Sequence, residues 1–303
     1  MINVKQRHGC SITVLCMLLG YSRQNYYQTL RRRQQDELEK ELIIQEVLKI
    51  RETQKKVGTR KLLIHVKPFL DQHQLKLGRD SLFSLLASHE LLVRKRKRKI
   101  PRTTFSDHWM HKYPNLIIGI SPLEAHQLWV SDITYIRHSE REHAYLSLVT
   151  DAYSRKIVGY YLSKDLSAQG CINALQKALA QLPEGSKLIH HSDRGCQYCS
   201  FDYVSLLQEH NISISMTQSG DPLENAIAER VNGILKQELL EESFVDLNTA
   251  RRSVDAALSI YNTVRLHSSI DMLTPENAHS MEGKFSRRWK TYYRKMEKEV
   301  PQQ

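Results

Sequence analysis

The sequence predicts small all-α, helix-turn-helix-like modules followed by an α/β core, in which a mixed five-stranded sheet carries helices on both faces. Helical periodicity, interrupted by Gly and Pro, extends as far as Val93. A block of basic residues then precedes three strand patterns, after which helices and strands alternate. From these changes we predict segments at residues 1–35, 36–93, 94–122, 123–280 and 281–303.

The composition is that of a globular chain with a polyanionic partner. The 303 residues are enough for two or three domains, and 41% of them are hydrophobic while 25% are charged. The net charge of +11 favours a partner such as nucleic acid. We expect no membrane span, because no apolar run is long enough, and no secretory signal. Five cysteines without a repeating spacing favour a reducing, cytoplasmic location at the nucleoid.

Both amino-terminal segments have patterns that suit DNA binding. The pattern of residues 1–35 predicts a helix, a turn at Gly20 and a second helix that ends at the arginines 31–33. These arginines either contact DNA phosphates or are simply solvated. In residues 36–93, the stretches Gly58 to Val66 and Gly78 to Leu92 are each a turn followed by an amphipathic helix with basic residues in its first turn. A plain helical bundle would have the same periodicity, so this pattern alone leaves both interpretations open.

Six consecutive cations separate the helical part from the core. They are Arg94, Lys95, Arg96, Lys97, Arg98 and Lys99. Because like charges repel, such a block indicates a linker rather than a packed element. Each cation that reaches a DNA phosphate would release a counterion, whereas a linker that touches nothing is the alternative. The tail from Lys284 mixes cations with aromatic residues, which is typical either of DNA-backbone binding or of a frayed end.

The core pattern begins with an antiparallel meander and continues as alternating helices and strands. Predicted strands cover Leu128 to Ile136, His143 to Thr150 and Lys156 to Leu162. A helix from Ser167 to Leu182, a strand from Lys187 to His191, a helix from Phe201 to His210 and a strand from Ile212 to Met216 follow. Another helix is predicted from Ala250 to Tyr261.

The stretch from Thr217 to Leu240 predicts a loop and then a helix that presents one carboxylate. Asp221 is a good N-cap, Pro222 suits the first helical position, and Glu224 has the spacing of a capping box. The apolar positions share one face of this helix, and the polar positions share the opposite face. The apolar set is Ile227, Val231, Ile234 and Leu235, and the polar set is Asn225, Glu229, Asn232 and Lys236.

Two aspartates lie upstream in apolar surroundings. Asp132 is inside the predicted strand LWVSDITYI, and Asp193 ends the run KLIHHSD. Ionised carboxylates in such places are costly unless a cation meets them. Between Asp193 and Glu229 there are 35 residues. This spacing, with DITYI behind Trp129, resembles the Asp, Asp, 35, Glu signature of DDE transposases and retroviral-type integrases.

The chain resembles one transposase family over most of the core. The pattern YNTVRLHSSIDMLTPENA from Tyr261 to Ala278 is similar to the end of the integrase core in orfB-type transposases of the insertion-sequence-three family. The element order then implies an RNase H-like integrase core, in which the first and fourth strands are neighbours. We interpret Tyr261, Asn262, Arg265 and His267 as a hydrogen-bonded wrap that closes this domain.

The resemblance also implies a metal site and DNA contacts. Asp132, Asp193 and Glu229 would hold two Mg²⁺ or Mn²⁺ ions per active site, with Asp132 bridging both, for DNA cleavage and strand transfer. Lys236, on the same helix face as Glu229, would hold a substrate phosphate. Asn225 would orient Glu229 or touch DNA.

Other residues compete for these roles. Asp151 could replace an aspartate of the triad, but DAYSR is typical of a turn that an Asp caps. Glu224 lies about 140° round the helix from Glu229 and already has a capping role. Cys196 and Cys199 form a C-x-x-C near two histidines, which could bind zinc, although the chain has no second cysteine pair.

We therefore predict an insertion-sequence transposase. Its partners would be double-stranded DNA, both terminal inverted repeats and target, and at least a second copy of itself, since two ends must be joined. An upstream-frame product, as a fusion or as a partner, belongs to the same expectation. The alternatives are a catalytically silent DNA-binding regulator with an integrase fold, and another RNase H-like nuclease such as a resolvase, which lacks the 35-residue interval.

Overall fold

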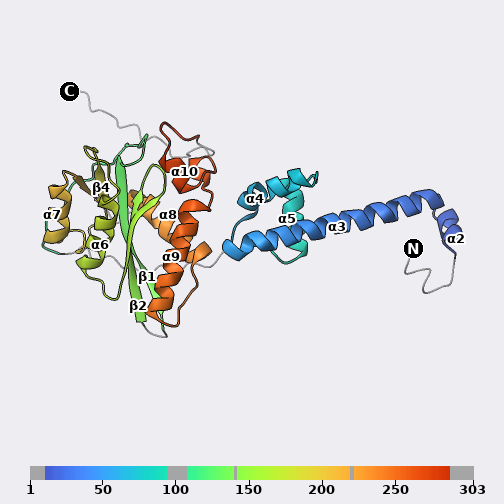
Figure 1. Ribbon diagram of the computed structural model, residues 1–303, viewed down its shortest axis with the longest axis horizontal. Coiled ribbons are helices and arrows are strands. Elements are labelled where there is room, and N and C mark those ends of the chain that lie inside the picture. Colours follow the sequence, from blue (N-terminus) through green and yellow to red (C-terminus); the bar gives the residue numbers. More distant parts are fainter. Residues whose placement is uncertain (1–10, 94–107, 140–141, 219–221, 287–303) are drawn as a thin grey trace, which may run out of the picture. The chain divides into compact units, whose positions relative to one another are not determined.

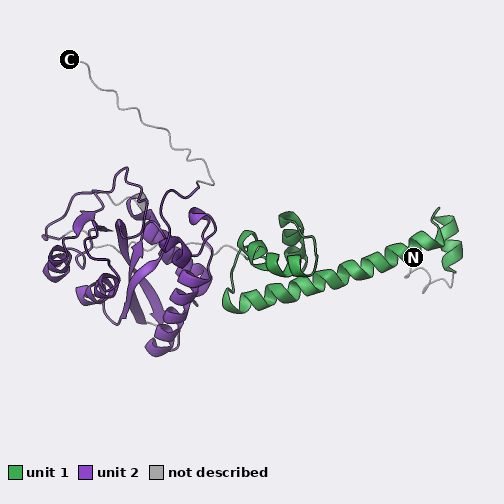
Figure 2. Cartoon of the chain, turned by 45° about the horizontal axis from the view of Figure 1, so that its top comes forward, with its two compact units in different colours: residues 1–94 green, residues 95–303 purple. Residues whose placement is uncertain are grey.

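The computed structural model describes residues 11–93, 108–139, 142–218 and 222–286. The chain divides into two compact units, residues 1–94 and residues 95–303 (Figure 2). No helix in the described part of the chain combines the length and the apolar character that crossing a bilayer needs.

The first unit is all-helical. It consists of α2 (Ile12–Leu18), α3 (Arg23–Thr53), α4 (Thr59–Gln72) and α5 (Arg79–Ser88). The hydroxyls of Ser11 and Ser22 accept hydrogen bonds from backbone N–H groups in the first turns of α2 and α3, as N-caps do. Leucine, isoleucine and valine side chains from the second half of α3, from α4 and from α5 form one buried cluster. The predicted turn-helix pairs after Gly58 and Gly78 therefore share a core.

Helix α3 is longer than predicted. The prediction ended a helix at the arginines 31–33, but α3 continues to Thr53, so the predicted division after residue 35 falls inside a single helix. The reason is local, because neither Gly nor Pro occurs in α3 and polar side chains pair one turn apart. Lys40 contacts Glu37 at 2.7 Å, and Gln45 donates to Glu41 at 2.8 Å. The predicted helix end was therefore wrong.

The second unit is built on a five-stranded sheet in the order β3-β2-β1-β4-β5. The strands are β1 (Leu128–His138), β2 (Glu142–Asp151), β3 (Ile157–Ser163), β4 (Ile189–Ser192) and β5 (Ser213–Met216). The first three are antiparallel, whereas β4 runs parallel to β1 and to β5. The predicted antiparallel meander is thus confirmed, and so is the predicted adjacency of the first and fourth strands.

Helices cover both faces of the sheet (Figure 1). On one face, α6 (Ala168–Leu179) and α7 (Phe201–Glu209) bury a cluster that includes Trp129. On the other face, α8 (Ala226–Ile234) and α9 (Leu247–Thr263) pack on β1, β2 and β3. The short helix α10 (Pro275–His279) follows α9. This arrangement confirms the predicted fold class.

The carboxyl-terminal residues close the domain as predicted. The side chain of Asn262 both accepts from and donates to the backbone of Ile157, each at 3.0 Å, so it completes the start of β3. Arg265 is buried and binds Glu238 through two guanidinium nitrogens at 2.8 and 2.9 Å. The ring of His267 stacks edge-on against Tyr261 and contacts Arg265 at 2.8 Å. The predicted hydrogen-bonded wrap is confirmed for Asn262, Arg265 and His267, whereas Tyr261 contributes by packing.

Gly159 in β3 lies directly beneath α6, and we expect Gly159→Ala to lower the free energy of unfolding by about 1–3 kcal/mol. A Cβ at this position would overlap the carbonyl oxygen of Ala174 and lie 2.8 Å from the Cβ of Ala178. Urea unfolding followed through the buried Trp129 measures this effect. The matched control is Gly233→Ala in α8, where the Cβ meets nothing within 4 Å and a gain of about 0.5–1 kcal/mol is expected. An unchanged stability of Gly159→Ala would contradict this packing.

Candidate active site

The sheet places Asp132 and Asp193 at corresponding positions of neighbouring parallel strands. Val130 of β1 pairs with His191 of β4, and each aspartate lies two residues further along its strand direction. Because side chains alternate between faces, Asp132 shares its face with Val130, which packs beside α8. Asp193 follows the last residue of β4, and its Oδ1 accepts the backbone N–H of Gly195 at 3.0 Å. The two carboxylates therefore lie on neighbouring strands near the carboxyl end of β4, close enough for their charges to interact.

A buried polar network holds these two strands on the opposite face. The ring Nε2 of His190 in β4 lies 2.8 Å from the hydroxyl of Ser131 in β1 and 2.9 Å from the hydroxyl of Tyr203 in α7. All three groups are buried. Burial lowers the pKa of His190 to about 3, so the imidazole stays neutral and acts only as a hydrogen-bonding bridge. Since Ser131 precedes Asp132, this bridge fixes the backbone that carries the aspartate.

Helix α8 contacts Asp132 through Asn232. The amide nitrogen of Asn232 donates to Oδ2 of Asp132 at 2.7 Å, and the backbone N–H of Ile133 donates to Oδ1 at 2.9 Å. Glu229 lies one turn before Asn232 on the same side of α8 and is exposed. The position of Asn232 on the polar face was visible in the sequence. Its bond to Asp132 was not predicted, because the approach of α8 to β1 is a tertiary contact.

Asn225 has a different role from the one predicted. Its side chain is buried and donates to the carbonyl oxygen of Ser131 at 3.0 Å, which leaves no exposed amide for a DNA contact. The reason is that residues Pro222–Asn225 form a 3₁₀ turn, so Asn225 is the N-cap of α8 and not part of its polar stripe. The predicted N-cap, Asp221, lies outside the described residues. Glu224 accepts a hydrogen bond from the backbone N–H of Gln218 and so closes the loop before the helix.

The end of this helix also differs from the prediction. After Ile234 the backbone changes from α to a π turn, Leu235–Leu239, whose first residues include Lys236. Such turns are frequent at functional sites. Burial lowers the pKa of the Lys236 ammonium, and the nearby Asp132 carboxylate raises it. Lys236 therefore lies close enough to Asp132 for their charges to interact.

The electrostatic surroundings of Asp132 disfavour its ionised carboxylate. Burial raises the pKa of Asp132 to about 7, the Asp193 carboxylate adds to this rise, and Glu229 contributes a smaller part. The hydrogen bonds from Asn232 and Ile133 act in the opposite direction. Three carboxylates that repel one another, with oxygen as the donor atom, fit a hard divalent cation such as Mg²⁺. Among the described residues, however, no three acidic, His or Cys side chains form a ready-made metal cage.

The rival residues have structural roles. Asp151 is fully buried, and its Oδ1 accepts from both the backbone N–H and the hydroxyl of Ser154 at 2.7 Å, which confirms the predicted turn cap. The thiol of Cys199 is buried against the sulfur of Met216. The cationic block at residues 94–99 lies outside the described residues, and its DNA contacts remain a prediction.

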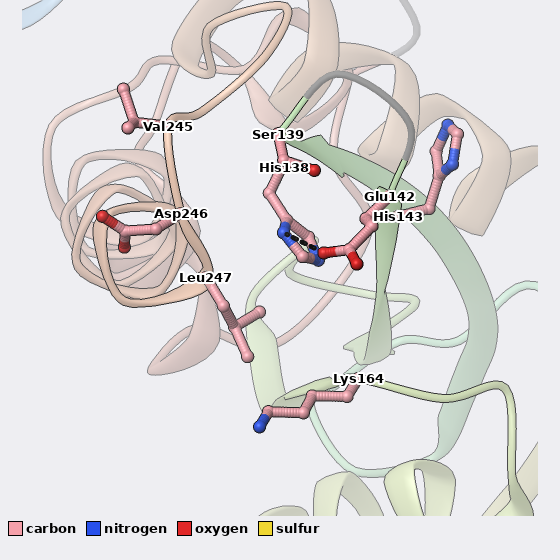
Figure 3. Close-up of a pocket in the computed structure, with 8 residues that line it drawn as sticks. All are labelled: His138, Ser139, Glu142, His143, Lys164, Val245, Asp246 and Leu247. Atoms are coloured by element: carbon pink, nitrogen blue, oxygen red, sulfur yellow. Dashed lines mark ion pairs between the residues drawn. The ribbon is translucent and has the colours of Figure 1, made fainter.

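A separate pocket of about 580 Å³ lies at the far end of β1, where it is lined by both charged and apolar side chains (Figure 3). His138, Glu142, Lys164 and the exposed Val245 are among its lining residues, and His138 and Glu142 approach to 3.7 Å. His138 is six residue steps, about 20 Å of extended strand, from Asp132. The pocket therefore does not belong to the carboxylate site.

Comparisons with known proteins match the core and most of the whole chain. Two family models, each described as an integrase core domain, match residues 122–222 and 210–275. An uncharacterised 31 kDa protein of insertion element IS600 from Shigella sonnei is 34% identical over 280 residues, which are 88% of this chain and 99% of that protein. The transposase InsF of insertion sequence IS3A from Escherichia coli is 38% identical over 152 residues, 50% of this chain and 52% of InsF.

The chain belongs to the insertion-sequence-three (IS3) family of transposases. The enzyme class of this family is the DDE-type polynucleotidyl transferases. Among solved structures, the catalytic core domain of HTLV-2 integrase in complex with magnesium matches 52% of the IS3-family chain and 99% of its own, with 20% identity and a TM-score of 0.42. A simian T-cell lymphotropic virus intasome structure matches 82% of this chain and 80% of its own, with 18% identity and a TM-score of 0.45.

Proposed function

We propose that this transposase cleaves the ends of its insertion sequence and joins them to target DNA, with Asp132, Asp193 and Glu229 as ligands of two Mg²⁺ or Mn²⁺ ions. The observation that carries the proposal is geometric: Asp132 and Asp193 occupy corresponding positions of neighbouring parallel strands, and the helix of Glu229 is bonded to Asp132 through Asn232 at 2.7 Å. The raised pKa of Asp132, which burial causes and to which both other carboxylates contribute, supports it. Because a charge cluster of this kind destabilises a protein, it is typical of functional sites. An oxygen-only donor set also suits these two cations.

Each residue of the site has a task that follows from its contacts. When bound, a pair of divalent ions supplies an activated attacking oxygen and stabilises the leaving oxygen. Asn232 keeps the Asp132 carboxylate oriented through its 2.7 Å hydrogen bond. The charge of Lys236 interacts with that of Asp132, so this ammonium would bind a DNA phosphate beside the carboxylates. Glu229 lies in the first turn of α8, where it is exposed, and would be the third carboxylate ligand of the ions.

The test is metal-dependent cleavage and joining of oligonucleotides that carry the element ends. We expect Asp132→Asn, Asp193→Asn and Glu229→Gln each to lower both rates at least about 100-fold while DNA binding persists, since each change removes a metal ligand. Asp202→Asn is the control, because Asp202 is an exposed acidic residue at the start of α7. Wild-type activity in any of the three variants would remove that residue from the site.

A catalytically silent regulator with the same fold is the second candidate. It would bind the element ends through the basic segments, including residues 94–99, without needing the carboxylates. The same assay separates the two functions, because a regulator would bind the ends but show no Mg²⁺- or Mn²⁺-dependent nicking. We also propose that the transposase acts as at least a dimer, since joining two ends to one target requires two of them together. Size-exclusion chromatography with light scattering on a DNA complex tests this stoichiometry.

A further inference from the structure

Trp109 is the most exposed large apolar side chain among the described residues, at 93% of its maximal accessible area. A tryptophan is usually at least partly buried, because its large apolar surface favours removal from water. Leaving nearly all of this surface in water is therefore unfavourable unless a ligand covers it.

The exposure of Trp109 is not that of a loose chain end. The ring Nε2 of His108 lies 2.8 Å from the backbone oxygen of Arg194. On the other side, Met110 and Tyr113 pack against the core cluster of α6 and α7. The carbonyl oxygen of the following Pro114 accepts the backbone N–H of Met216 at 3.2 Å. The residues on both sides of Trp109 are thus held, while its indole ring projects into solvent.

These anchors place Trp109 beside the carboxylate site. Arg194, whose carbonyl oxygen contacts His108, directly follows Asp193 in the chain. Trp109 is next to His108, the His108 side chain contacts Arg194, and Arg194 is next to Asp193, the predicted metal ligand. Consecutive Cα atoms are only about 3.8 Å apart, so this connection is short. Met216 ends β5, and the backbone N–H of the next residue, Thr217, bonds to Ser192 immediately before Asp193. The segment that carries Trp109 therefore follows the sheet edge at which Asp193 lies.

Two cations, Lys112 and Arg194, lie near the loop to which the Trp109 segment is bonded. Lys112 and Arg194 form no ion pair with any residue that the structure describes. Burial raises the pKa of Cys199 to about 11, and both cations oppose this rise, which places them near the loop that follows Asp193. An exposed aromatic ring with unpaired cations beside it is the combination that binds single-stranded nucleic acid, because bases stack on the ring and phosphates meet the cations.

We propose that Trp109 stacks on an unpaired base of the DNA strand next to the phosphate that is cut. The proposal rests on the proposed DNA cleavage and adds a positioning residue to it. Stacking would hold open the base step at the cleavage site, as apolar and aromatic side chains do in other DNA complexes. Lys112 and Arg194 would neutralise the backbone of the same strand.

The test compares binding of two element-end duplexes without divalent ions, one fully paired and one with three unpaired bases at the cleavage position. A 2-aminopurine in the unpaired segment reports stacking by its fluorescence. We expect the wild type to bind the unpaired end more tightly and to quench the probe. Trp109→Ala should lose about 10-fold or more in affinity for the unpaired end and lose the quenching, whereas Trp109→Phe keeps both within about 3-fold.

The matched control is Ile118→Ala, which removes another exposed apolar side chain, 74% accessible, from the same connector. Equal affinity and equal quenching by wild type and Trp109→Ala would overturn the proposal. An unchanged thermal midpoint of Trp109→Ala, expected because the ring contacts solvent, excludes misfolding as the cause of a loss. Since no turnover is needed, failure of the stacking proposal is distinct from failure of the proposed cleavage, which the metal-dependent assay reports on its own.

Discussion

Asp132→Asn is expected to make the metal-free transposase more stable at pH 8 while removing its activity. The folded-state pKa of Asp132, about 7, is above the ordinary value of 3.8, so folding favours the protonated carboxyl. The resulting penalty is absent below about pH 4, grows as the pH rises towards 7 and is fully present above it. One pKa unit corresponds to about 1.4 kcal/mol, and partial exposure of the carboxylate reduces the total, so we expect a gain of about 1–3 kcal/mol.

Urea unfolding in EDTA at pH 4 and pH 8 measures this gain, which should be present only at pH 8. Addition of Mg²⁺ should stabilise the wild type, because a ligand that binds only the folded state shifts the equilibrium towards it, and should stabilise the variant much less. The exposed Asp202→Asn should leave stability within about 0.5 kcal/mol at both pH values. A variant that is less stable than the wild type at pH 8 in EDTA would show that the Asp132 carboxylate is not under electrostatic strain.

Glu238→Ala is expected to cost about 3–5 kcal/mol of folding free energy. Its carboxylate is the charged partner of Arg265, whose side chain is 3% exposed. Without Glu238 the guanidinium would remain buried beside His267 with no acidic partner among the residues that the structure describes. A buried cation that loses its counter-charge carries a desolvation penalty that nothing offsets. The pair also connects the π turn that contains Lys236 to the segment after α9.

Glu276→Ala is the matched control, because Glu276 pairs with Lys156 at 2.9 Å but is half exposed. We expect this change to cost less than about 1 kcal/mol, since water replaces the lost partner. Replacing both Glu238 and Arg265 with Met should recover part of the loss from Glu238→Ala, because no charge then stays buried. Urea unfolding monitored at Trp129 compares all of these variants. Equal costs for Glu238→Ala and Glu276→Ala would contradict the role of burial.

Much of the core could be predicted from local pattern. The strand patterns around Asp132 and before Asp193 were apolar enough to be found directly, and the helical period placed Glu229, Asn232 and Lys236 on one face. The length of α3 was underestimated because a run of arginines resembles a helix end, although nothing in the run breaks a helix. The 3₁₀ turn at Asn225 and the π turn after Ile234 were missed, since both have ordinary helix-forming sequences.

Periodicity along the chain was sufficient for the element order, because that order depends on neighbours within a few turns or strand positions. The three acidic residues were chosen from the 35-residue interval and the family resemblance that it carries. The partners of those residues needed the folded molecule. The hydrogen bond of Asn232 to Asp132, the burial of Asn225 against Ser131 and the anchoring of Trp109 through His108 each join segments about 80 to 100 residues apart. Such contacts depend on how helix and sheet approach one another, and no local pattern encodes that approach.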